Sequence, residues 1–196
     1  MKKLSSVCLV AIALTMGCAV NAKNINSNQS YYWYDGDRQV EVHLDETLIA
    51  DFNRRTDVAA KAATDSNLSA GKKISGAQLW KVTPGSSSGL ALKSVKSQDQ
   101  SGAYSPVFRE SKTSGAMRAL PGGVVVQFSP DWDESRISQW VSDQGQSIES
   151  KAEFGTNFYI IASPSGLASL EIANGLYETG DVLLASPNWW RERYAK

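Results

Sequence analysis

Side chains that could carry acid–base or nucleophilic chemistry are few in this chain of 196 residues. His43 is the only histidine, and it lies on the polar side of an alternating segment, which favours a surface position. No Gly-x-Ser-x-Gly elbow or other nucleophile motif accompanies it. An enzyme would need His43 or a carboxylate pair in a pocket, and the sequence predicts a non-catalytic protein instead.

The carboxylates and glycines do not form a metal or cofactor motif. Asp131, Asp133 and Glu134 superficially suggest a calcium loop, but the glycine and terminal Glu of such a loop are missing. Asp131 followed three residues later by Glu134 is instead typical of a capping box at the start of a helix. Gly122 and Gly123 precede a predicted strand, whereas a phosphate-binding loop follows one. We therefore expect no metal and no cofactor.

Two aromatic clusters could stack on sugars or on single-stranded nucleic acid. The first is the run Tyr-Tyr-Trp-Tyr at residues 31–34, and filling a joint between layers is the favoured interpretation for it. The second, Trp189 and Trp190, lies beyond the last predicted strand. The tail that contains it is either a strap folded back on the core or a recognition strand offered to a partner.

An N-terminal leader differs in composition from the rest of the chain. Lys2 and Lys3 precede an apolar run over residues 7–16, and small residues follow, as in a secretory signal peptide cleaved after Ala22. A lipoprotein modified at Cys18 is the alternative, although the leucine lies four rather than three residues before that cysteine. Both cysteines fall in the leader, so the mature chain is expected to lack disulfides and to be periplasmic or extracellular.

The charge balance argues against nucleic acid as a partner. Twenty Lys and Arg balance twenty Asp and Glu, and removal of the two leader lysines gives 18 − 20 = −2. No overall positive field would therefore attract a polyanion. No second apolar segment approaches the roughly 18 residues that a membrane-spanning helix needs, so no membrane contact is expected after signal cleavage.

The C-terminal part has the clearest secondary-structure pattern. Strands are predicted at residues 123–128, 147–154, 157–162 and 182–185, and helices at 131–145 and 166–180. This β-α-β-β-α-β order predicts an α+β fold, a ferredoxin-like antiparallel sheet with two helices on one face.

The N-terminal part predicts a β-rich segment. Asp35-Gly36 between alternating stretches indicates a hairpin, and residues 48–52 and 76–82 are typical of strands. Residues 56–73 could form a short helix or a loop. Residues 84–115 indicate flexible Ser/Gly-rich connections around one or two short strands. The expected organisation is a signal peptide at 1–22, an N-terminal segment at 23–120, an α+β domain at 121–188 and a tail at 189–196.

Continuous apolar runs at residues 124–126, 159–161 and 182–184 give both faces of the predicted sheet apolar side chains. Two helices can cover only one face. The N-terminal segment or a partner protein must cover the other, because a bare apolar sheet is unusual on a soluble monomer.

The residues that carry a family resemblance are the strand at 122–128, the helix after it, and the stretch from Leu167 to Asn188. They resemble the N-terminal propeptide, or inhibitor domain, of subtilisin-like serine proteases. The stretch 185–188 reads Ala-Ser-Pro-Asn where the family has Ala-Glu-Pro-Asn, so Ser186 departs from the pattern. The hairpin at 31–37 is similar to the start of longer leaders in bacterial secreted members.

The resemblance implies an inhibitor or folding chaperone that acts in trans on a subtilisin-like protease. Its open sheet face would lie on two helices of the protease, and its tail would enter the substrate cleft as an added strand. The implied sheet-face residues are Val125, Gln127, Tyr159, Ile161, Leu183, Ala185 and Ser186. The implied cleft-binding tail is Trp189, Trp190, Arg191, Glu192, Arg193, Tyr194, Ala195 and Lys196. The alternative is a secreted binding or structural module that uses the same fold.

Overall fold

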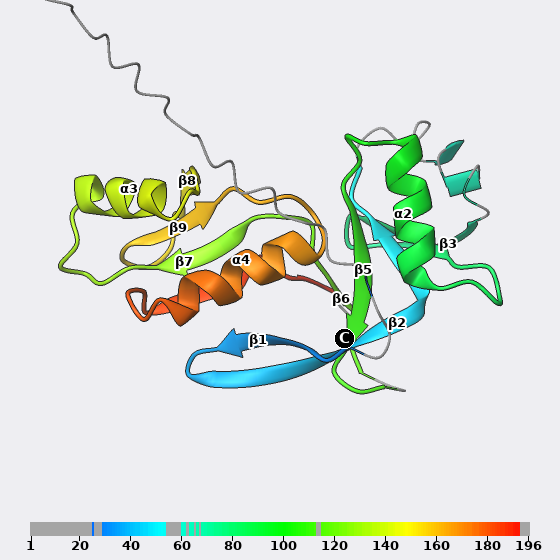
Figure 1. Cartoon of the computed structure of the whole chain (residues 1–196), viewed down its shortest axis with the longest axis horizontal. Helices are drawn as coiled ribbons and strands as arrows, with labels where there is room; N and C mark the ends of the chain where they lie inside the picture. The colour runs from blue at the N-terminus through cyan, green and yellow to red at the C-terminus, as the bar shows by residue number, and fades with distance from the viewer. Residues whose placement is uncertain are drawn as a thin grey trace, which may run out of the picture.

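The computed structural model describes residue 25 and residues 29–53, 60–61, 63–64, 66, 68–112 and 115–192. In this part of the chain, the strands form two antiparallel sheets and the helices connect and cover them. This arrangement confirms the predicted mixed α+β class (Figure 1). The leader at 1–22 and the last four residues, 193–196, lie outside the described residues, so the predictions made for them are carried forward unchanged.

The smaller sheet is formed by the C-terminal part of the chain. Its strands, in the order β10-β7-β9-β8, are β7 (Val124–Gln127), β8 (Ile148–Lys151), β9 (Phe158–Ile161) and β10 (Leu184–Pro187). Helix α3 (Glu134–Asp143) connects β7 to β8, and α4 (Leu167–Glu178) connects β9 to β10. Val126 of β7, Ile137 of α3 and Ala173 of α4 belong to one core cluster, so both helices cover the same face.

The helices of this unit follow from local signals. Asp133 caps α3, because its side chain accepts a hydrogen bond from the Arg136 N–H at 2.8 Å. The capping box predicted at Asp131 is therefore displaced by two residues. Ile137 and Val141 are buried, as their helical spacing predicts, and Gly145 follows the helix with a φ of 68°.

The larger sheet has the order β11-β6-β5-β2-β4-β3, and β1 pairs with β2. Its strands are β1 (Tyr31–Asp35), β2 (Arg38–Asp51), β3 (Ser69–Ile74), β4 (Ala77–Lys81), β5 (Tyr104–Arg109), β6 (Arg118–Ala119) and β11 (Trp190–Arg191). The hairpin predicted at Asp35-Gly36 is confirmed. Residues 38–51 form one strand where two were predicted, with a register shift between Asp45 and Ile49 against β5.

Helix α2 (Ser88–Gln98) replaces part of the flexible connection predicted for residues 84–115. The side chain of Ser87 caps it by accepting from the Leu90 N–H at 3.3 Å. Ala91, Leu92 and Val95 are buried against the larger sheet. The Ser- and Lys-rich composition concealed this helix because only one narrow side of it is apolar.

The β1–β2 hairpin packs beside α4 and β10, as Figure 1 shows for the blue strand below the orange helix. Tyr31 and Trp33 of the hairpin share a core cluster with Leu167 and Leu170 of α4. The hairpin therefore packs on α4, which lies on the helix side of the smaller sheet.

Candidate docking face, tail and groove

The register of the smaller sheet decides which side chains face away from its helices. Val124 and Val126 are fully buried against the helices, so Val125 and Gln127 point to the other side. Residues paired across strands share a face. The outer face, as defined here, consists of Val125, Gln127, Phe158, Ile160, Leu184 and Ser186.

The outer face consists of partly buried side chains, of which four are apolar and two are polar. All six of its residues are partly accessible, and its four apolar side chains belong to none of the core clusters formed by the described residues. Phe154 extends the surface at one end: it is 59% exposed, and its ring centroid lies 5.2 Å from that of Phe158.

Three of the residues predicted for this face lie on the opposite one. Tyr159, Ile161 and Ala185 are at most 5% exposed and belong to the core beneath α3 and α4, so their assignment to a sheet surface is wrong. Leu183 precedes β10 and is 53% exposed. Val125, Gln127 and Ser186 do lie on the outer face.

Sequence reasoning missed Phe158, Ile160 and Leu184 on the outer face. A continuous apolar run does not reveal which alternate residues face the helices, because both sets are apolar. The polar side chain of Gln127 was the one indication in β7 of which side of the sheet faces away from the helices. Its cross-strand partners Phe158 and Leu184 share its side of the sheet, once the pairing is known.

The tail is bound to the protein's own larger sheet as far as Glu192. Strand β11 pairs with β6, and the Glu192 N–H donates to the carbonyl oxygen of Met117 at 2.9 Å. The Trp190 indole N–H donates to the carbonyl oxygen of Ser75 at 2.9 Å. Of the two alternatives left open for the tail, residues 189–192 therefore take the strap that folds back on the core.

Trp189 anchors this strap in the core next to the hairpin. Its ring centroid lies 6.0 Å from that of Trp33 and 5.9 Å from that of Phe108, both in edge-on geometry. The guanidinium of Arg118, a residue only 7% exposed, lies 5.5 Å from the Trp33 ring centroid and 6.0 Å from that of Trp189. The aromatic faces thus share in stabilising a largely desolvated cation.

Two arginines lie directly opposite each other where the strap pairs with β6. Arg191 is the cross-strand partner of Arg118. Burial, followed by the charge of Arg118, lowers the pKa of Arg191. Glu110 offsets part of this repulsion, because its Oε1 accepts from the Arg118 Nη2 at 2.5 Å.

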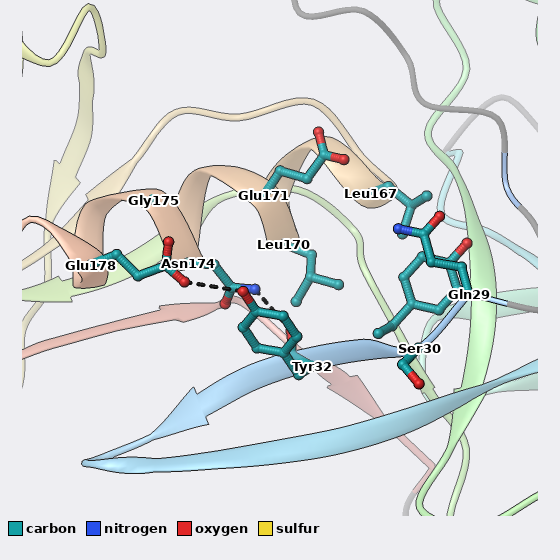
Figure 2. Close-up of a pocket in the computed structure, with 10 residues that line it drawn as sticks. Gln29, Ser30, Tyr32, Leu167, Leu170, Glu171, Asn174, Gly175 and Glu178 are labelled. Atoms are coloured by element: carbon teal, nitrogen blue, oxygen red, sulfur yellow. Dashed lines mark hydrogen bonds between the residues drawn. The ribbon is translucent and has the colours of Figure 1, made fainter.

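A groove of about 280 Å³ lies between the hairpin and α4 (Figure 2). The Tyr32 hydroxyl donates to the Glu178 Oε1 at 3.1 Å, and the Tyr34 hydroxyl donates to the same oxygen at 3.0 Å. The hydrogen bond to Glu178 is the main cause that raises the pKa of Tyr32. The Asn174 side-chain amide donates to the backbone carbonyl of Tyr32 at 2.9 Å, which fixes the spacing of helix and hairpin.

The side chains considered for catalysis and metal binding do not form a site among the described residues. The His43 Nδ1 lies 3.8 Å from the Glu41 Oε1 on strand β2, and the histidine side chain is 24% exposed. Over the described ranges, no group of three or more His, Cys, Asp or Glu side chains is placed to hold a metal ion. A search of the same ranges finds no helix with the length and apolar character needed to cross a membrane.

Comparison of the chain with known protein families, with curated proteins and with solved structures finds no match.

Proposed function

We propose that this chain is a non-catalytic protein-binding module that acts in trans on a subtilisin-like serine protease, as a propeptide-like inhibitor or folding chaperone. The observation that carries the proposal is the outer face. Val125, Phe158, Ile160 and Leu184 form an apolar surface on one side of a sheet whose other side is fully packed. Apolar surfaces of this kind commonly mark protein contacts.

Two further features fit this function. The order β7-α3-β8-β9-α4-β10, with two helices on one face, supports assigning a ferredoxin-like topology to residues 124–187, the arrangement that the resemblance implies. The leader at 1–22 supports export, which would bring the protein into the compartment of a secreted protease.

Inhibition of peptide hydrolysis by a subtilisin-type protease tests the proposal, starting with any such enzyme encoded beside this gene. The inhibitor would be the chain from Lys23, which retains every described residue. Ile160→Glu and Leu184→Glu each place a charge on the outer face. Because central apolar contacts contribute about 2 kcal/mol or more each, inhibition should weaken by at least about thirtyfold.

The matched control is Leu90→Glu. Leu90 is 65% exposed on α2, which packs against the larger sheet, so this substitution adds the same charge elsewhere. It should leave inhibition unchanged. Thermal unfolding of each variant separates lost docking from lost folding. If folded Ile160→Glu and Leu184→Glu inhibit as well as the parent chain, or if the parent chain inhibits no such protease, the proposal fails.

A second candidate function is favoured by the position of the tail. With residues 189–192 paired to β6, the chain resembles a self-contained binding module whose tail is a structural strap. Inhibition by the parent chain distinguishes the two candidates, because only the first predicts it. Truncation after Asn188 tests the tail itself: lost inhibition with little lost stability would indicate a tail that acts in the protease cleft, whereas a marked loss of stability indicates a structural strap and leaves the outer face as the docking surface.

A further inference from the structure

Charge is distributed unevenly along the chain. Residues 121–188, which include the smaller sheet and its two helices, contain nine Asp and Glu and two Lys and Arg, a formal charge of 2 − 9 = −7. Residues 23–120 and 189–196 together contain sixteen Lys and Arg and eleven Asp and Glu, a formal charge of 16 − 11 = +5. The smaller sheet therefore belongs to a strongly acidic part of a chain that is nearly neutral as a whole.

Both basic side chains of this acidic part lie on the helix side of the sheet. Lys151 is the cross-strand partner of Tyr159, a core residue beneath the helices, and its Nζ lies 2.6 Å from the Glu134 Oε1 of α3. Arg136 belongs to α3, and its guanidinium lies 4.1 Å from the Trp132 ring centroid. Neither cation is therefore placed to neutralise negative charge at the outer face.

Exposed carboxylates border the outer face along one end and one edge of the sheet. Because neighbouring strands are antiparallel, β7 ends where β9 and β10 begin, and the tip of β7 marks this end at the left of Figure 1. Asp131 follows β7, Glu153 lies between β8 and β9, and Asp181 precedes β10. Glu149 lies on the edge strand β8. Asp181 accepts from the Trp140 indole N–H at 3.0 Å, which leaves its charge in place.

These four carboxylates, Asp131, Glu149, Glu153 and Asp181, are called the acidic rim. Among the described residues, none of them forms an ion pair with a Lys or Arg side chain. The rim therefore presents uncompensated negative charge next to the apolar side chains of the outer face.

Exposed apolar side chains gather at the same end of the sheet. Phe154, between β8 and β9, is 59% exposed, and Leu183, directly before β10, is 53% exposed. The Phe154 ring contacts Phe158 of the outer face, with 5.2 Å between the ring centroids. An apolar patch with a polar rim is typical of a protein–protein contact, and the sign of the rim charge then indicates the chemistry of the partner.

We propose that the outer face binds a protein surface that is apolar at its centre and rich in Lys and Arg around it. The apolar centre would lie on Phe158, Ile160 and Leu184, and the basic groups would face the acidic rim. Opposite potentials accelerate association and disfavour partners of the wrong charge. This inference rests on the proposed function, because it names the chemistry of the partner at the same face.

Fluorescence anisotropy with two labelled peptides tests the inference. The peptides are Lys-Leu-Lys-Leu-Lys-Leu-Lys and Glu-Leu-Glu-Leu-Glu-Leu-Glu, which share their leucines and differ in the sign of their charge. Titrated with the chain from Lys23 in about 50 mM NaCl, the lysine peptide should bind saturably and at least about tenfold more tightly than the glutamate peptide. In about 300 mM NaCl its affinity should fall by at least about threefold, because salt screens the rim.

Variants of the chain locate the binding. Ile160→Glu removes an apolar contact and adds a negative charge, so it should weaken binding of the lysine peptide at the outer face, whereas it would strengthen a contact made by charge alone. Asp131→Asn combined with Glu153→Gln should weaken binding by at least about threefold. Leu90→Lys combined with Gln98→Lys changes the net charge equally on α2, and binding should stay within about twofold of the parent chain.

Three results would each overturn the inference. The lysine peptide does not bind saturably up to about 1 mM of the chain, or the two peptides bind equally, or folded Ile160→Glu and Leu184→Glu both bind the lysine peptide as tightly as the parent chain. Thermal unfolding shows which variants are folded.

Failure of the proposed function gives a different pattern. In that case the lysine peptide binds at the outer face as expected, but the parent chain inhibits no subtilisin-type protease. Inhibition that depends on the outer face, together with equal binding of the two peptides, overturns the inference alone.

Discussion

Replacing Trp189 by alanine tests whether the tail holds the fold together. The indole packs edge-on against Trp33 and Phe108, and it helps to cover the buried guanidinium of Arg118. Removing it leaves a hole between the hairpin and β5. It also exposes one side of the arginine and weakens the attachment of β11.

The expected loss follows from this packing. Truncation of a buried Trp to Ala costs about 3 to 5 kcal/mol, and Trp189 falls toward the lower end because its side chain is only partly buried. A loss of about 3.5 kcal/mol corresponds to a fall in the unfolding temperature of about 7 to 14 °C for a chain of this size. Globular domains have a total stability of about 5 to 15 kcal/mol, so the expected loss is a large fraction of the free energy of unfolding.

Differential scanning calorimetry of Trp189→Ala, of the truncation after Asn188 and of a Leu183→Ala control measures this effect. Leu183 is 53% exposed, so its substitution should change stability by no more than about 0.5 kcal/mol. The truncation should lower the unfolding temperature at least as much as Trp189→Ala. If both tail variants unfold within about 2 °C of the parent chain, which is below 1 kcal/mol, the strap does not stabilise the fold and the reasoning is refuted.

Three further outcomes are expected. Gly175→Ala should raise the free energy of unfolding by about 0.5 to 1 kcal/mol in urea titrations, because a Cβ meets no atom there; a loss of stability would contradict this. Asp133→Ala should lower it by about 1 kcal/mol through loss of the α3 cap, and an unchanged urea midpoint would refute that role. Burial, with the nearby charges of Asp51 and Asp99, raises the pKa of Tyr104 above its usual 10.0. The folded chain thus holds the phenol proton more tightly than the unfolded chain, and stability should fall as the pH rises above about 10. Urea unfolding between about pH 8 and 11 should show a smaller fall in Tyr104→Phe, and an equal fall in both chains would argue against this assignment.

Elements with strong local signals could be predicted from the sequence. The Asp35-Gly36 turn between alternating strands specifies the hairpin, and the apolar spacing of Ile137 and Val141 specifies α3. These signals act over a few residues, so they do not depend on the rest of the chain. Even there, the sequence predicted the α3 cap at Asp131, whereas the structure has it at Asp133, because both aspartates precede the same helix and both are good capping residues.

Helix α2 shows where local reasoning was insufficient. Only Ala91, Leu92 and Val95 provide its apolar side, and the surrounding Ser and Lys residues are equally typical of a loop. Packing against the larger sheet stabilises this helix, and that packing depends on strands that are distant in sequence.

The sequence by itself determined the charge balance and the scarcity of candidate catalytic side chains, and it predicted the strands and helices between residues 121 and 188. It also indicated that both faces of the smaller sheet are apolar. Only the tertiary structure decided that Ile160 and Leu184, rather than Tyr159 and Ala185, lie on the outer face, because a shift of one residue in register exchanges the two faces. It also decided that Trp189 and Trp190 fold back onto the core, since their partners Trp33, Phe108 and Ser75 are brought together only by the fold.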